Sequence, residues 1–108
     1  MQEQETFIER RGRKLNMIIA FRWYSSQSNP PQLSPEQLEK ANAMLLAQGC
    51  IERIEPRPQE PRKDYRLTSK GLALIPKVNE TFGKILRAHG EYGPLTGSQS
   101  LDEATYFD

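Results

Sequence analysis

The sequence predicts an α+β fold that is mostly helical and contains a two-stranded antiparallel ribbon. Two runs with helical periodicity come first, from Phe7 to Tyr24 and from Pro35 to Gln48. Two short strand-like runs then flank a proline-rich loop, and a third helical run follows the second strand at once. With 108 residues, the chain is long enough for one modest hydrophobic core.

The first helix is expected from Phe7 to Tyr24. One stripe has helical spacing and consists of Ile8, Gly12, Leu15, Ile19 and Trp23. From Leu15 onward the helix is apolar around most of its circumference, which is typical of a segment surrounded by neighbours. Gly12 lowers helix stability by roughly 1 kcal/mol relative to Ala, so the run is either one helix or two that meet near Gly12. The proline-bearing residues 25–33 form a connector.

Local capping signals define the second helix, Pro35–Gln48. Ser34 is a suitable N-cap, Pro35 suits the first helical position and Gln37 completes a capping box. Gly49 occupies the position that follows a helix C-terminus.

Two strands and a third helix complete the predicted domain. The strands are expected at Cys50–Glu55 and Asp64–Thr68, with the loop Pro56–Lys63 between them because proline cannot donate to a ladder. Thr68 can cap a helix that runs through Leu86 and that Pro76 kinks or restarts.

The charge is unevenly distributed along the chain. All 15 Lys and Arg residues lie in residues 1–89, whereas four of the 14 acidic residues lie in residues 90–108. The sequence therefore predicts a folded, mildly basic domain over 1–89 and an acidic, disordered tail over 90–108.

A longer pattern carries a family resemblance. A helix with leucine and alanine at regular spacing ends in Gly, a short I-E-R strand follows, and the motif Y-R-L-T-S-K-G comes after a basic loop. The residues that carry this pattern are Leu38, Ala41, Leu45, Gly49, Ile51, Glu52, Arg53, Tyr65, Leu67, Thr68, Lys70 and Gly71. Over roughly residues 33–75 this resembles the winged-helix transcription regulators of the PadR and MarR type. The resemblance implies a winged helix (winged helix-turn-helix) with a two-stranded wing and a long C-terminal helix.

The chain departs from that family before Pro35. The family places two helices ahead of the recognition helix, whereas here one run, Phe7–Tyr24, and the connector precede it. Either the run splits near Gly12 to supply both helices, or the helix-turn-helix is truncated. A truncated motif would lack the helix that positions the reader in the groove.

The resemblance makes Pro35–Gln48 the recognition helix. Gln37 and Asn42 would read adenine edges, and Lys40 would reach guanine or phosphate. Glu36 and Glu39 repel phosphate, so the alternative is a solvated face of a structural helix.

Two basic groups are candidates for phosphate contacts. The wing carries the basic residues Arg53, Arg57, Arg62, Lys63 and Arg66, which could contact phosphate or the minor groove. Alternatively, they could pair with the interleaved acidic residues across the ribbon. The N-terminal basic cluster is the densest and consists of Arg10, Arg11, Arg13 and Lys14. It suits phosphate, an acidic partner or a solvated face.

Two functions follow as hypotheses. The first is a small DNA-binding transcription regulator that binds duplex DNA and forms a homodimer through the helices Phe7–Tyr24 and Thr68–Leu86. The second is a winged-helix protein-interaction module, such as a phage- or mobile-element-type adaptor or inhibitor, that binds a protein partner through the wing or the acidic tail.

Catalytic and membrane functions have no support in the sequence. It contains no P-loop, nucleophile elbow, HExxH motif or metal-ligand spacing, so we expect no enzyme, metal or cofactor. Its single cysteine, Cys50, can form no internal disulfide. The longest apolar run, Met17–Phe21, is too short to span a bilayer, and no signal-peptide pattern opens the chain. A cytoplasmic protein is therefore expected.

Overall fold

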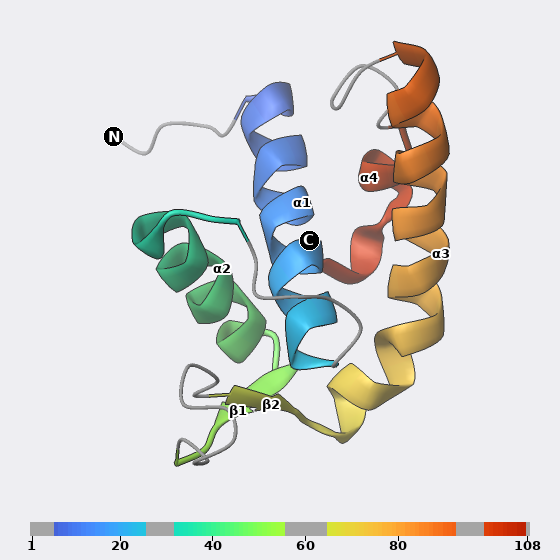
Figure 1. Ribbon diagram of the computed structural model, residues 1–108. Helices are drawn as coiled ribbons and strands as arrows, with labels where there is room; N and C mark the ends of the chain where they lie inside the picture. Colours follow the sequence, from blue (N-terminus) through green and yellow to red (C-terminus); the bar gives the residue numbers. More distant parts are fainter. Residues whose placement is uncertain (1–5, 26–31, 56–64, 93–98, 108) are drawn as a thin grey trace.

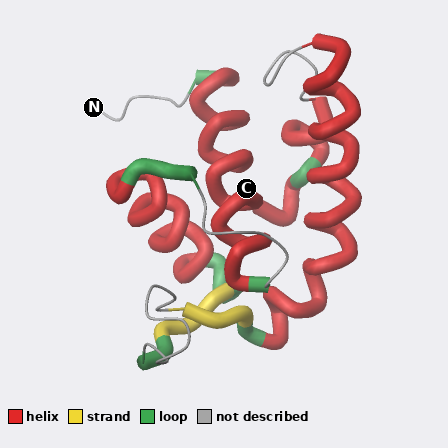
Figure 2. Tube along the Cα trace, in the orientation of Figure 1, coloured by secondary structure: helices red, strands yellow, loops and turns green. Residues whose placement is uncertain are grey.

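The computed structural model describes residues 6–25, 32–55, 65–92 and 99–107. The elements, in chain order, are α1 (Phe7–Tyr24), α2 (Pro35–Ala47), β1 (Ile51–Arg53), β2 (Tyr65–Leu67), α3 (Ser69–Tyr92), α4 (Gln99–Glu103) and the 3-10 turn η1 (Thr105–Phe107). Helix α1 stands in the middle, with α2 on one side, α3 on the other and the strands at the base (Figure 1). Figure 2 shows how small the sheet is beside the helices, which confirms a mostly helical α+β fold.

Helix α1 is a single helix that runs through Gly12. Thr6 is its N-cap, and the Thr6 hydroxyl accepts a hydrogen bond of 3.1 Å from the Glu9 amide. A division near Gly12 is therefore wrong. Only one helix precedes α2 among the described residues, because α1 has no break that would supply a second.

Helix α2 begins and ends where the local signals predict. The Ser34 hydroxyl accepts from the Gln37 amide at 3.1 Å, and the Gln37 side chain accepts from the Ser34 amide at 3.0 Å. Gly49 follows with φ of 72°, a left-handed conformation that only glycine adopts without strain. The two strands are shorter than predicted and pair antiparallel, with Ile51 opposite Leu67.

A close junction joins the ribbon to α3. The Thr68 hydroxyl accepts from the Gly71 amide at 3.2 Å, which confirms Thr68 as the cap, and the Thr68 amide donates to the Cys50 carbonyl at 3.0 Å. Helix α3 is continuous through Pro76, although its first turns bend away from the rest of its axis in Figure 1. It extends to Tyr92, beyond the predicted end at Leu86.

The predicted disordered tail is wrong for residues 99–107, here named the C-terminal segment. This segment forms α4 and η1 and lies between α1 and α3 (Figure 1). Leu101 and Phe107 are fully buried and Ala104 is nearly so. Leu101 and Phe107 supply apolar surface that the acidic composition of the tail obscured, and they belong to the same hydrophobic core as side chains of α1, α2, the two strands and α3.

The core is therefore shared by both ends of the chain. The Phe21 and Phe107 ring centroids are 5.8 Å apart, in a tilted pair that belongs to this core. The aromatic residues Phe21, Trp23 and Tyr24 near the end of α1 are buried, and so is Cys50. The buried apolar residues are Met17, Ile18, Ala20, Phe21, Trp23, Tyr24, Ala41, Leu45, Cys50, Ile51, Leu67, Val78, Ile85, Leu101, Ala104 and Phe107.

Two glycines of α3 give opposite expectations for the same substitution. A Cβ at Gly71 would overlap the Cys50 carbonyl, whereas a Cβ at Gly83 would meet no atom within 4 Å. We expect Gly71→Ala to lower the free energy of unfolding by roughly 1–3 kcal/mol, as overpacking does. The matched control, Gly83→Ala, should raise it by up to about 1 kcal/mol through helix propensity. Urea unfolding followed by circular dichroism measures both, and equal stability of the two variants would contradict the close junction.

Candidate nucleic-acid interface

The outer face of α2 carries two of the predicted DNA contacts. Gln37 and Lys40 are both exposed. The side-chain oxygen of Gln37 accepts the hydrogen bond of the capping box, and the Lys40 ammonium lies 3.8 Å from the Glu36 carboxylate. An exposed pair of this kind contributes little to stability, so Lys40 can exchange Glu36 for another anion at small cost.

Asn42 lies on the opposite side of α2 and is buried. The Tyr24 hydroxyl donates a 2.7 Å hydrogen bond to the Asn42 side-chain oxygen. This bond fastens α1 to α2, so the prediction that Asn42 reads base edges is wrong for this fold. The physical reason is helical rotation: position 42 follows Ala41 and precedes Leu45 on the face that packs against α1.

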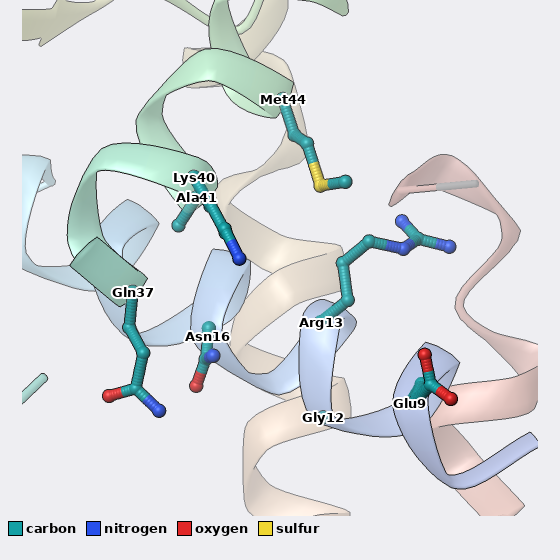
Figure 3. Close-up of a pocket in the computed structure, with 8 residues that line it drawn as sticks. All are labelled: Glu9, Gly12, Arg13, Asn16, Gln37, Lys40, Ala41 and Met44. Atoms are coloured by element: carbon teal, nitrogen blue, oxygen red, sulfur yellow. The ribbon is translucent and has the colours of Figure 1, made fainter. Parts of the chain in front are cut away.

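A groove of about 380 Å³ separates the first half of α1 from α2. It brings together Arg13, Gln37 and Lys40 from the sequence prediction and adds Asn16, which the sequence reasoning missed. Figure 3 shows Lys40 extending from α2 toward α1, where Asn16 and Arg13 lie. The other residues that line it are Glu9, Gly12, Ala41 and Met44. Asn16 could have been found from helical spacing, because it falls on the same stripe as Glu9 and Gly12.

The N-terminal basic cluster is engaged by the C-terminal segment. Arg11 binds Asp102 through two hydrogen bonds, Nε to Oδ1 at 3.1 Å and Nη2 to Oδ2 at 2.7 Å. The Arg13 guanidinium donates to the Phe107 carbonyl at 3.2 Å. In this conformation, those two guanidinium groups therefore donate hydrogen bonds to oxygens of the C-terminal segment.

Lys14 is the most constrained member of the cluster. It is 1% exposed, and its ammonium donates to the Leu101 carbonyl at 3.1 Å. A buried charge is tolerated only with hydrogen-bond partners, so this contact is structural. Lys14 is not available to a phosphate in this conformation, and it is far more buried than Arg10, which lies at the surface.

The Arg11–Asp102 contact changes the pKa of both side chains. The hydrogen bonds from Arg11 lower the pKa of Asp102 below its ordinary value, and the positive charges of Arg11, Lys14 and Arg10 lower it further. The same hydrogen bonds raise the pKa of Arg11. Both shifts favour the charged pair.

The two basic side chains of the ribbon that the structure describes each lie beside another side chain of the ribbon. Arg66 lies 2.6 Å from the Glu52 carboxylate across the two strands, and both side chains are exposed. The Arg53 guanidinium lies 5.3 Å from the centre of the Tyr65 ring. The predicted wing residues Arg57, Arg62 and Lys63 lie outside the described residues.

Comparison of this chain with protein-family models, with curated proteins and with solved structures gives no match. The family resemblance therefore stays a prediction based on its motif. Within the part of the chain that the structure describes, no group of three His, Cys, Asp or Glu side chains is placed to hold a metal ion. No described helix has the length and apolar character that crossing a membrane requires.

The pairing of Asp102 predicts a pH dependence. Because the folded-state pKa lies below the ordinary value of 3.8, the pair adds stability above that value and loses it as pH falls through the folded-state pKa. We expect the stability difference between the native chain and Asp102→Asn to be fully present at neutral pH and to shrink at an acidic pH below 3.8, as the pH falls through the folded-state pKa. Urea unfolding at both pH values measures it, with Glu103→Gln as the control for a lost acid. A difference independent of pH would contradict the assignment.

Proposed function

We propose that the chain is a small winged-helix DNA-binding protein that acts as a transcription regulator and holds duplex DNA mainly through its phosphates. The order of elements supports this proposal, since a helix, two antiparallel strands and a long helix follow one another from Pro35 to Tyr92. Helix α2 then takes the place of the recognition helix, and β1 and β2 take the place of the wing.

One observation carries the proposal: Gln37 and Lys40 are exposed on the open groove beside α2, and Arg13, whose guanidinium also bonds to the Phe107 carbonyl, lines that groove from α1. A guanidinium, an ammonium and an amide are the groups that contact phosphate and base edges. Lys40 and Gln37 are exposed at the surface where a duplex would lie against α2.

The geometry favours phosphate contacts over base reading. Asn42 packs inward, and the exposed acids Glu36 and Glu39 remain on α2. Two carboxylates near a duplex weaken binding of every sequence alike. The proposed protein therefore discriminates little between DNA sequences through α2. The basic side chains of its ribbon contact the phosphate backbone of the DNA.

Duplex titrations at several salt concentrations test this function. Affinity should fall steeply with salt, and Lys40→Ala should weaken binding to all sequences and reduce the salt slope by about 1. Lys84→Ala is the matched control, because Lys84 also pairs with a Glu four residues earlier, Glu80 at 3.5 Å, on α3. Binding that is undetectable at low salt, or insensitive to salt, would refute the proposal.

A protein-interaction module is the second candidate, and the acids on α2 favour it. Glu36 and Glu39 are exposed and Glu9 lines the groove, so this surface presents carboxylates as well as basic side chains. Such a mixed surface suits a protein partner with complementary charges.

Charge reversal at α2 separates the two candidates. For a DNA-binding protein, Glu36→Lys/Glu39→Lys should strengthen duplex binding about tenfold or more, since two repulsive charges become attractive. For a protein-interaction module, the same variant should lose a stoichiometric partner that the native chain captures from a lysate. Duplex titration and pull-down are each carried out with the native chain and with the double variant. If neither experiment distinguishes the two proteins, this face of α2 has no part in either function.

Dimerisation through the two long helices belongs to the same proposal. Leu72 and Leu86 on α3 are each 57% exposed and are available to a second copy. On α1, Ile8 is 65% exposed, but Met17, Ile18 and Phe21 are already buried within the chain. The α3 surface is therefore the better-supported half of the proposed interface.

A further inference from the structure

The C-terminal segment lies directly on the N-terminal basic cluster. Arg11, Arg13 and Lys14 all donate hydrogen bonds to it, from about one turn of α1. The acceptors are a carboxylate and two main-chain carbonyl oxygens. Guanidinium and ammonium groups bind phosphate oxygens with the same donors, so one set of side chains has two possible uses.

A second set of contacts fastens the segment to α3. The Tyr106 hydroxyl donates to the Thr81 hydroxyl at 2.6 Å, and Phe107 and Leu101 fill the space between the helices. The segment is thus held by apolar burial in its centre and by polar contacts along two edges.

The Arg11 edge is the place where an outside anion can enter. The Asp102 and Arg11 side chains are 28% and 16% exposed, so water and ions reach this ion pair. Lys14, which is deeper, can be reached only when Leu101 leaves. The partly exposed Arg11–Asp102 pair is therefore the contact that an outside anion meets first.

The secondary structure of the segment depends on its docking. Helix α4 has five residues and η1 has three. Isolated helices of that length are not stable in water, because nucleation costs more than so few hydrogen bonds return. A released segment would consequently lose its helices and leave the cluster open.

We propose that the C-terminal segment is an autoinhibitory strap that competes with the phosphates of duplex DNA for Arg11, Arg13 and Lys14. This inference rests on the proposed DNA-binding function and adds its regulation. By linkage, a duplex that binds the cluster must weaken docking of the segment by the same factor by which docking weakens duplex binding.

Two adjacent acids provide a matched test. Asp102→Asn removes the Arg11 ion pair, whereas Glu103→Gln removes the same charge from an exposed neighbour. In duplex titrations at one salt concentration, Asp102→Asn should bind roughly fivefold more tightly than Glu103→Gln, the effect of one charge-assisted pair. Tyr106→Phe loosens the α3 edge without a charge change and should also tighten binding relative to the native chain.

Hydrogen exchange gives an independent readout on the intact native chain. Saturating duplex should accelerate exchange of the amides of residues 99–107, because bound DNA and docked segment exclude each other. Equal affinities of Asp102→Asn and Glu103→Gln, or exchange that is unchanged or slower with DNA, would overturn the strap. If neither the native chain nor any variant binds duplex, the proposed function itself fails, and the two failures are thereby distinguished.

Discussion

The charged side chain of Lys14 is buried on the face of α1 that the C-terminal segment covers. This burial is the constraint on which the packing of that segment depends. An ammonium that is 1% exposed requires acceptors within reach, and the Leu101 carbonyl is one of them. The Leu101 carbonyl also accepts from the Ala104 amide at 3.2 Å, so one oxygen with two lone pairs serves both the end of α4 and the Lys14 ammonium. Lys14 therefore finds an acceptor in the same segment whose apolar residues Leu101 and Phe107 are buried in the core.

The opposite end of the molecule depends on a backbone contact. The Cys50 carbonyl accepts from the Thr68 amide and lies where a side chain at residue 71 would otherwise stand. The Lys70 ammonium donates to the Gln48 carbonyl at 2.6 Å, which ties the start of α3 to the end of α2. These bonds set the direction in which α3 leaves the ribbon. That direction opens the space beside α1 that the C-terminal segment fills.

Electrostatic roles in this fold are assigned by burial and neighbours more than by composition. Arg11 and Arg13 look like phosphate ligands in the sequence, yet each donates to the far end of the chain. Lys40 has the same charge but lies on an exposed face opposite a weakly held carboxylate. A basic side chain on α1 therefore has to be released before it can bind, whereas one on α2 needs only to exchange a surface partner.

The sequence by itself determined the elements and their limits. The caps at Ser34 and Thr68, the left-handed Gly49 and the apolar periodicity of α1 are short-range signals, because they depend on residues within a turn or two of one another. They predicted three long helices and the ribbon, and they placed Gln37 and Lys40 on an open face.

Only the tertiary structure decided which face of each helix is covered and what covers it. Asn42 turns inward because Tyr24 meets it there, a contact between helices that local pattern does not contain. The bonds of Arg11, Lys14 and Arg13 to the C-terminal segment join residues 91, 87 and 94 positions apart. A segment as short as 99–107 carries no periodic signal of its own, and its structure comes from the burial of Leu101 and Phe107 against α1 and α3.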